Sequence, residues 1–176
     1  MKRLTISALC AVVFGASGVS AAEVTVTINA ITAEGVGPII GTVAFQDTSK
    51  GLKIWPNLRS LTKGRHGFHI HENADCGARE KDSKPVVGLA AGGHFDPDNV
   101  GKHEGPKGMG HLGDLPVLYV DDKGRATRTS FAPRLETSDL LEGRAIVIHA
   151  GGDNYLDQPV PLGGGGARVG CGVVVH

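Results

Sequence analysis

The stretch Glu23-Val24-Thr25-Val26-Thr27-Ile28 alternates apolar and polar side chains with a period of two. Successive side chains of a β-strand point to opposite faces, so the valines and Ile28 would share one face and the threonines the other. Six further segments show a similar alternation. They are residues 40–45, 52–55, 67–71, 126–131, 144–149 and 167–175. The pattern therefore predicts a chain built mainly of short β-strands.

Turn-forming residues separate these segments, as in Glu34-Gly35-Val36-Gly37-Pro38 and in residues 48–51 and 121–124. A helical turn is indicated only at 138–143, where Ser138 or Asp139 can start it. Short strands with regular turn signals are typical of an antiparallel sandwich or barrel. We therefore expect an all-β fold.

The composition limits the classes of function that the chain can serve. Its 176 residues fit one domain, and 40% apolar residues exclude a disordered chain. Eighteen basic residues balance 18 acidic ones, which argues against a nucleic-acid partner. The 27 glycines follow no collagen-like period and indicate long loops.

The N-terminus has the pattern of a secretory signal. Lys2 and Arg3 precede the short apolar run 4–14, and small residues end at Ala22. The run is too short to span a membrane, so we expect removal of 1–22, a single mature domain at 23–176 and no membrane insertion of that domain. Removing two of the 18 basic residues leaves 16 against 18 acidic ones, a net charge of −2.

Two cysteines remain in the expected mature chain, Cys76 and Cys171. Export places a protein in an oxidising compartment, where an even number of cysteines indicates disulfide pairing. The sequence therefore predicts one disulfide that closes most of the domain.

Residues 73–116 show little strand or helix pattern, and a loop of this length needs something to order it. His94, His103, His111 and Asp114 lie within it, and three histidines with one aspartate form a sound tetrahedral zinc set. A bound metal could therefore order the loop. The alternative is a polar surface loop, which has no need of clustered histidines.

Three more histidines lie in or beside predicted strands. His69 and His71 are two apart and would face the same side, while His149 ends an apolar run. Alone, each could be an ordinary surface or strand-edge residue. Together with the loop they make seven ligands, and two four-coordinate ions need eight positions unless one imidazole serves both. An all-imidazole site suits copper, and a site with a carboxylate suits zinc.

Five motifs in the chain resemble those of the copper,zinc superoxide dismutases of the exported bacterial type. They are Gly67-Phe68-His69-Ile70-His71-Glu72, Ala91-Gly92-Gly93-His94-Phe95-Asp96-Pro97, Gly110-His111-Leu112-Gly113-Asp114-Leu115-Pro116, Ile148-His149-Ala150-Gly151-Gly152-Asp153-Asn154-Tyr155 and Pro161-Leu162-Gly163-Gly164-Gly165-Gly166-Ala167-Arg168. The resemblance covers nearly all of the expected mature chain. It implies an antiparallel Greek-key β-sandwich or flattened barrel with long metal-binding and electrostatic loops.

The resemblance also implies one copper and one zinc ion per chain and a role for each matching residue. Those that match the copper ligands are His69, His71, His149 and the bridging His94. Those that match the other zinc ligands are His103, His111 and Asp114. Asp153 matches the carboxylate that holds one ligand of each metal, and Cys76 and Cys171 match the family disulfide. Arg168 matches the residue that attracts the anionic substrate at the copper mouth.

The implied activity is oxidoreductase chemistry, in which superoxide becomes dioxygen and hydrogen peroxide by copper redox cycling, with His94 delivering a proton. An enzyme of this kind in the periplasm would protect the cell envelope, and a homodimer is left open. Lys102 and Lys107 are further candidates for steering the substrate, whereas His66 and His176 match no ligand motif and are expected at the surface or as caps.

Three other functions are known for proteins with copper or zinc ligands of these types. A non-catalytic copper/zinc storage or delivery module shares the ligands but needs neither Arg168 nor the tethering disulfide. A blue-copper electron carrier needs a Cys–His–Met cluster, and no Met follows Cys171. A zinc hydrolase keeps one coordination position of its zinc open, whereas in this chain the expected fourth protein ligand would fill that position.

Overall fold

The computed structural model describes residues 23–141 and 143–175. The strands are β1 (Glu23–Thr32), β2 (Gly35–Thr48), β3 (Gly51–Leu58), β4 (Gly64–His66), β5 (Phe68–His71), β6 (Arg79–Lys81), β7 (Lys84–Val86), β8 (Leu118–Val120), β9 (Ser130–Ala132), β10 (Ala145–His149) and β11 (Arg168–Val173). The helices are the short α1 (Thr137–Leu141) and the 3₁₀ turns η1 (Leu89–Ala91) and η2 (Leu162–Gly164). The expected signal peptide and His176 lie outside the described residues.

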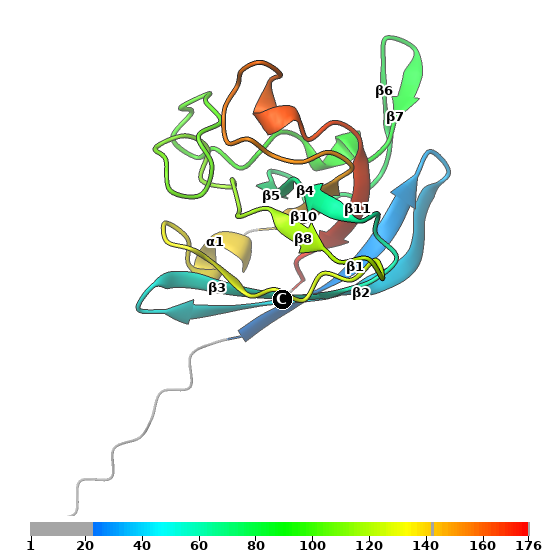
Figure 1. Cartoon of the computed structure of the whole chain (residues 1–176). Helices are drawn as coiled ribbons and strands as arrows, with labels where there is room; N and C mark the ends of the chain where they lie inside the picture. The colour runs from blue at the N-terminus through cyan, green and yellow to red at the C-terminus, as the bar shows by residue number, and fades with distance from the viewer. Residues whose placement is uncertain (1–22, 142, 176) are drawn as a thin grey trace, which may run out of the picture.

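Seven strands form one antiparallel sheet in the order β5-β10-β11-β1-β2-β3-β9. The sheet curls into a half-barrel, and the two-stranded pair β4-β8 lies across its open side (Figure 1). This architecture confirms the predicted all-β class. No helix of the described residues has the length and apolar character of a membrane span.

The period-two pattern that predicted the strands also sorts their side chains. Val26 and Ile28 of β1 are buried in the main core with Val43 and Phe45 of β2, while the β1 threonines stay outside it. In the β1–β2 ladder Val26 is the direct partner of Val43. Burying the apolar face of each strand is the main stabilising contribution to such a sheet.

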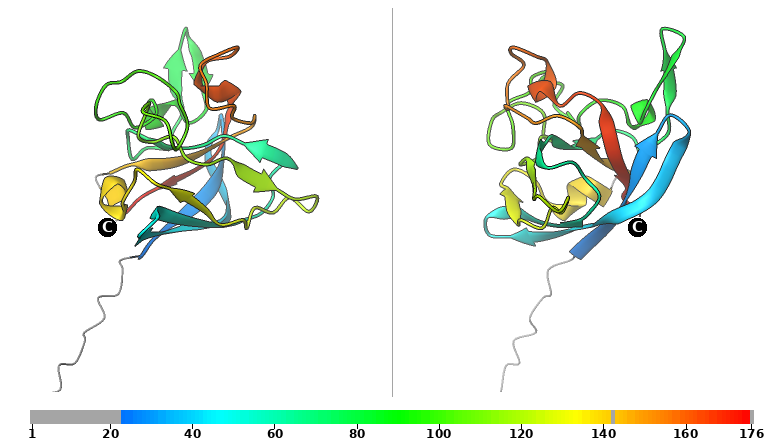
Figure 2. Two further views of the ribbon diagram at one scale, coloured as in Figure 1. Left: turned by 60° about the vertical axis from the view of Figure 1, so that its left-hand side comes forward. Right: turned by 45° about the vertical axis from the view of Figure 1, so that its right-hand side comes forward.

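β5 and β10 are buried on both faces, and this decides where the site lies. Phe68 and Ile70 of β5 and Ile146 and Ile148 of β10 enter the main core. The alternate residues of the two strands therefore face away from that core. Long loops cover this outer face, and the views of Figure 2 place segments 95–116 and 150–167 at the same end of the sheet.

Two expectations about local structure were wrong in detail. The predicted strand 126–131 is mostly loop, because only Ala126 forms an isolated bridge to Leu58 before β9 begins at Ser130. Segment 73–116 contains the exposed hairpin β6–β7 and the turn η1. The hairpin buries nothing on either face, so it leaves no apolar alternation to recognise.

Candidate metal centre

Two adjacent strands supply three of the candidate copper ligands. His69 and His71 lie on β5, and His149 ends the neighbouring strand β10. In the ladder Val147 pairs with His69 and Ala145 pairs with His71, which fixes the two strands side by side. The side chains alternate with core residues, so the strands present all three imidazoles to the outer face.

The long loop is joined to the same strand by main-chain pairing. His94 forms an isolated antiparallel bridge with His71, and Asp114 forms another with His69. The Ile70 N–H donates to the Gly113 carbonyl and the Ile70 carbonyl accepts from the Phe95 N–H, both at 2.9 Å. The backbone of β5 therefore sets the position of both ends of the loop that carries the remaining ligands.

The folded chain brings the candidate ligands into two buried groups whose ligand atoms lie within 4.8 Å of one another. The first group is His69, His71, His94 and His149. The second is His69, His94, His103 and Asp114. The first group is the predicted copper set, and the second contains three of the four predicted zinc ligands. His69 and His94 belong to both groups, as a bridging ligand must.

The hydrogen bonds of the first group leave one nitrogen of each ring free for a metal. The free, buried nitrogens are His69 Nδ1, His71 Nε2, His94 Nε2 and His149 Nε2, none of which has a hydrogen-bond partner among the described residues. The opposite nitrogens are occupied by Asp153, the Gly92 carbonyl, Asp114 and the Gly166 carbonyl respectively. Buried polar atoms are rarely left without partners, so four that converge fit a cation with imidazole ligands.

His111 lies at the edge of the second group. Its Nδ1 is buried without a hydrogen-bond partner in the described chain and is 3.5 Å from Asp114 Oδ1. Its ring centroid is 5.3 Å from that of His94 and 6.2 Å from that of His103. His69, by contrast, already uses Nε2 for Asp153 and directs Nδ1 toward the first group.

Asp153 connects the two groups. Its carboxylate accepts hydrogen bonds from His69 Nε2 and from His103 Nε2, each at 2.8 Å. Gly163 has a left-handed φ of 69°, and a Cβ there would lie 2.0 Å from Asp153 Oδ1. The glycine of this predicted motif thus leaves room for the carboxylate, which orients one ligand in each group.

The pKa shifts of the candidate copper ligands favour metal binding. Burial lowers the pKa of His69, His71 and His94, and it lowers that of His149 to about 4. These imidazoles are therefore neutral at pH 7, the form that coordinates metals.

The carboxylate of the second group is ionised at the same pH. Burial alone would raise the pKa of Asp114, but hydrogen bonds from His103 and His94 hold it well below its usual range. For His103, burial is outweighed by contacts with Asp114 and Asp153, which raise its pKa to about 9. The metal-free group therefore keeps a proton at the position where a cation would bind.

Arg168 lies half-buried beside the first group. Its guanidinium donates to the carbonyls of Gly88 and Gly92, and the Gly92 carbonyl also accepts from His71 Nδ1. After burial, the positive charge of Arg168 further lowers the pKa of His71 and His149. The structure thus places this cation next to the imidazole cluster.

The predicted disulfide is present between Cys76 and Cys171, with a Cα–Cα distance of 5.8 Å. Both cysteines pack in a small second core with Ala91 and Val147. The bond ties the loop before η1 to β11, the strand that begins at Arg168. It therefore fixes the segment that supplies both carbonyl acceptors of Arg168.

Of the two alternatives expected for His66, surface or cap, the surface location is wrong. His66 is only 2% exposed and is not a surface residue. Its Nδ1 lies 2.7 Å from the His149 carbonyl and its Nε2 lies 2.7 Å from the Thr62 carbonyl. His66 therefore links the start of the β4–β5 segment to the end of β10, a contact that no spacing rule indicates.

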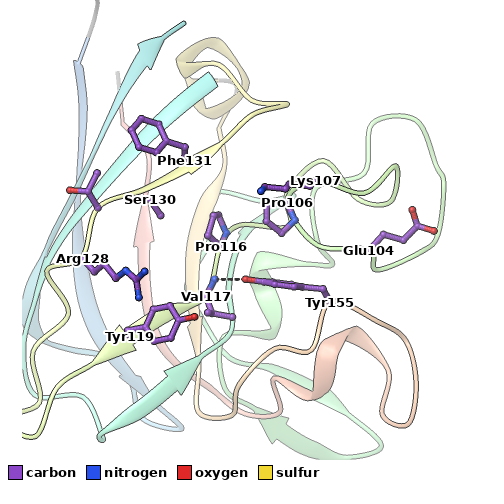
Figure 3. A pocket seen from close by; sticks show the side chains of 11 residues that line it. Glu104, Pro106, Lys107, Pro116, Val117, Tyr119, Arg128, Ser130, Phe131 and Tyr155 are labelled. Atoms are coloured by element: carbon purple, nitrogen blue, oxygen red, sulfur yellow. Dashed lines mark hydrogen bonds between the residues drawn. The ribbon is translucent and has the colours of Figure 1, made fainter. Parts of the chain in front are cut away.

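A groove of 520 Å³ lies on the far side of the Asp153 loop. Among the residues that line it, Figure 3 shows Tyr155 and Val117 joined by a hydrogen bond, with Tyr119 and Phe131 to their left. Tyr155 accepts from the Val117 N–H through its hydroxyl, and its own N–H donates to Asp153. Tyr155 therefore lies between the groove and the metal centre, and none of the candidate ligands lines the groove.

A curled β-sheet with an imidazole cluster and a His/Asp cluster that share His69 and His94 defines a binuclear copper/zinc protein. Comparison with known proteins narrows this class. The family model described as copper/zinc superoxide dismutase matches residues 39–174. "Superoxide dismutase [Cu-Zn] 2" of Salmonella typhimurium is 52% identical over 174 residues, 99% of each chain.

Solved structures agree with the family model. A Cu/Zn superoxide dismutase from Brucella abortus has a TM-score of 0.85 and 45% identity, covering 87% of this chain and 99% of its own. A monomeric copper, zinc superoxide dismutase from Salmonella enterica has a TM-score of 0.77 and 55% identity, with the same coverage. The chain belongs to the copper/zinc superoxide dismutase family and is an oxidoreductase with copper and zinc sites.

Proposed function

We propose that this enzyme converts superoxide to dioxygen and hydrogen peroxide with a specific division of ligands. The proposed copper ligands are His69, His71, His94 and His149. The proposed zinc ligands are His94, His103, His111 and Asp114. The four converging buried nitrogens without partners among the described residues carry this proposal.

His94 has the position of a proton carrier as well as a ligand. Its Nδ1 bonds to Asp114 at 2.9 Å, so the other nitrogen, Nε2, is the one directed at the copper group. Bound copper supplies the one-electron redox couple of the reaction. His94 Nε2 can hold a proton whenever it is not coordinated, and peroxide formation requires protons.

Arg168 is proposed as the residue that attracts and orients the anion. Two backbone carbonyls fix its guanidinium close to His71 and His149 without neutralising its charge. A fixed cation beside an open metal position raises the local concentration of a small anion and its rate of encounter. The storage or delivery alternative gives this cation no role.

Stopped-flow decay of superoxide with the metal-loaded protein tests the proposal. The wild type should turn over many substrates per copper, and Arg168→Ala should lower the rate and weaken its dependence on ionic strength with unchanged metal content. Arg125→Ala removes an exposed arginine that pairs with Asp121 and serves as the control. Stoichiometric decay by the wild type would favour the storage alternative, and an unaltered salt dependence in Arg168→Ala would remove that residue from the mechanism.

The proposed location is the periplasm, where the enzyme would protect the cell envelope. The secretory pattern at 1–22 and the Cys76–Cys171 disulfide support export of a mature domain at 23–176. Mass spectrometry of protein from the periplasmic fraction should give a chain that begins at Glu23. A chain with an intact Met1, retained in the cytoplasm, would contradict this location.

A second copy of the chain is a candidate partner, as the sequence left open. The groove exposes Tyr119 and Phe131 near Arg128, Lys107 and Glu104, so it offers apolar surface with charges of both signs (Figure 3). The Salmonella enterica relative is described as monomeric. Sedimentation velocity of the metal-loaded protein distinguishes a monomer from a homodimer, since a mass of one chain excludes the homodimer.

A further inference from the structure

An arginine outside the loop that carries His103 and His111 holds the part of the loop next to His111. Arg134 Nη1 donates to the carbonyls of Gly108 at 2.7 Å and Gly110 at 3.0 Å, and lies 3.5 Å from that of His111. Its Nη2 donates to the Gly110 carbonyl at 3.1 Å. One guanidinium therefore spans the backbone of the turn that ends at a proposed zinc ligand.

Arg134 extends from a firmly anchored part of the sheet end. It follows β9, and the next residue, Leu135, is only 2% exposed in the main core. Thr137 then donates to the Asp47 carboxylate from its N–H at 2.7 Å and from its hydroxyl at 2.6 Å. The guanidinium thus starts from a backbone that core packing and β2 hold in place.

Within the loop, the His111 N–H donates to the Lys102 carbonyl at 2.9 Å, but the turn between these two residues is rich in glycine. Only seven residues lie between His103 and His111, and they include Gly105, Gly108 and Gly110. A Cβ at Gly110 would lie 2.3 Å from the Lys102 carbonyl, so the turn closes tightly on itself. Glycines lose more conformational freedom on ordering than other residues, which makes an external anchor valuable here.

We propose that Arg134 is a positioning residue for the zinc site, resting on the proposed assignment of His111 as a zinc ligand. By fixing the Gly110 and His111 carbonyls it holds the His111 ring beside Asp114 before any metal arrives. Loss of such supporting contacts typically costs about 10- to 100-fold in metal affinity. Arg134→Ala should raise the zinc dissociation constant by that factor.

The planar fork of arginine matters for this role. Arg134 serves neighbouring carbonyls with two nitrogens at once, whereas a lysine ammonium is a single point donor on a flexible stem. Arg134→Lys should therefore restore part of the zinc affinity. The copper site should change little, because the hydrogen bonds of Arg134 in the described structure go to loop carbonyls and not to the strands that carry three of the proposed copper ligands.

The test is zinc competition against a chromophoric chelator, with full-length mature protein. Wild type, Arg134→Ala, Arg134→Lys, His111→Ala and the control Arg125→Ala are compared, and the visible bands of the Co(II)-substituted zinc site are recorded for each. Arg134→Ala should weaken zinc binding and shift the Co(II) bands, Arg134→Lys should lie between it and wild type, and Arg125→Ala should match wild type. Copper affinity, measured with copper alone, should stay within about twofold in the arginine variants.

Other outcomes separate this inference from the proposed function. Wild-type zinc affinity in Arg134→Ala together with weak binding by His111→Ala would overturn the role of Arg134 and leave the ligand set intact. Wild-type zinc affinity in His111→Ala would overturn the ligand set, and the Arg134 inference with it. Equal loss of zinc and copper in Arg134→Lys would reduce Arg134 to a general stabilising residue.

Discussion

The two halves of the metal centre are built in different ways. On the copper side His69, His71 and His149 stand on neighbouring strands whose ladder is buried on both faces. On the zinc side His103 and His111 stand on a glycine-rich loop with no ladder of its own. The copper side is therefore positioned by the fold, and the zinc side by hydrogen bonds and by the metal itself.

The two halves therefore differ in how easily they open. A ladder between buried strands opens only with much of the domain, whereas loop positions open locally at small free-energy cost. Asp153 and Asp114 connect the halves, since each contacts a strand-borne or bridging histidine and a loop histidine. Substitution of either aspartate should therefore weaken metal binding mainly on the zinc side.

The largest effect is expected from the residue that both halves share. His94→Ala removes one ligand from each group and should reduce dismutation to background, because neither metal keeps four ligands. Metal analysis and stopped-flow superoxide decay measure this. Substantial turnover with one copper and one zinc per chain would show that the halves do not depend on a common ring.

Removing the disulfide should affect the whole fold and then the copper mouth. In Cys76→Ser/Cys171→Ser the unfolding free energy should fall by about 2–5 kcal/mol, since a native disulfide constrains the unfolded chain. Urea denaturation of the metal-free protein gives the value. An unchanged midpoint would mean that packing of the second core alone fixes the loop to β11.

Asp153→Asn should weaken the two metal sites unequally. The amide cannot accept from both His69 and His103, so metal affinity should fall by about 10- to 100-fold on the zinc side and by less on the copper side. His69 keeps its place on β5, whereas His103 depends on the loop. Competition titrations with each metal separately measure the two losses, and a greater loss for copper would reverse the interpretation.

The smallest predicted effect is on the metal-free protein in mild acid. The pKa of His149 is about 4 in the fold against 6.5 in the unfolded chain, so the unfolded state takes up the proton first as the pH falls. Stability should therefore decrease from about pH 6.5 toward pH 4. Thermal unfolding across this range checks the sign, and metal-loaded protein is the control. A flat profile for the metal-free protein would contradict it.

Much of the copper side could be predicted from sequence because a period of two fixes which residues share a face. The spacing of His69 and His71 placed both rings on one side of a strand, and β5 confirms it. The β6–β7 hairpin and the burial of His66 could not be predicted in this way. Their partners are lone polar contacts or solvent, which leave no periodic trace in the chain.

On the zinc side the sequence showed a cluster of residues that can bind zinc, but it did not show how the loop that carries them is held in place. Arg134 is 23 residues away from His111 in the chain and belongs to no ligand motif. Its role depends on where β9 ends relative to the loop, which only the folded sheet defines. A residue that acts through backbone carbonyls carries no signature in its own neighbourhood.

The strand pattern, the pair of cysteines and the set of residues able to bind metal follow from the sequence, because local periodicity and side-chain chemistry are properties of the chain. Which nitrogen of each ring is free, how Asp153 reaches both groups and what holds the loop are set by the folded domain. These depend on contacts between residues far apart in the chain, such as His103 with Asp153, 50 positions away, and Arg134 with Gly108, 26 positions away. Packing of the whole domain sets such distances, and no local rule contains them.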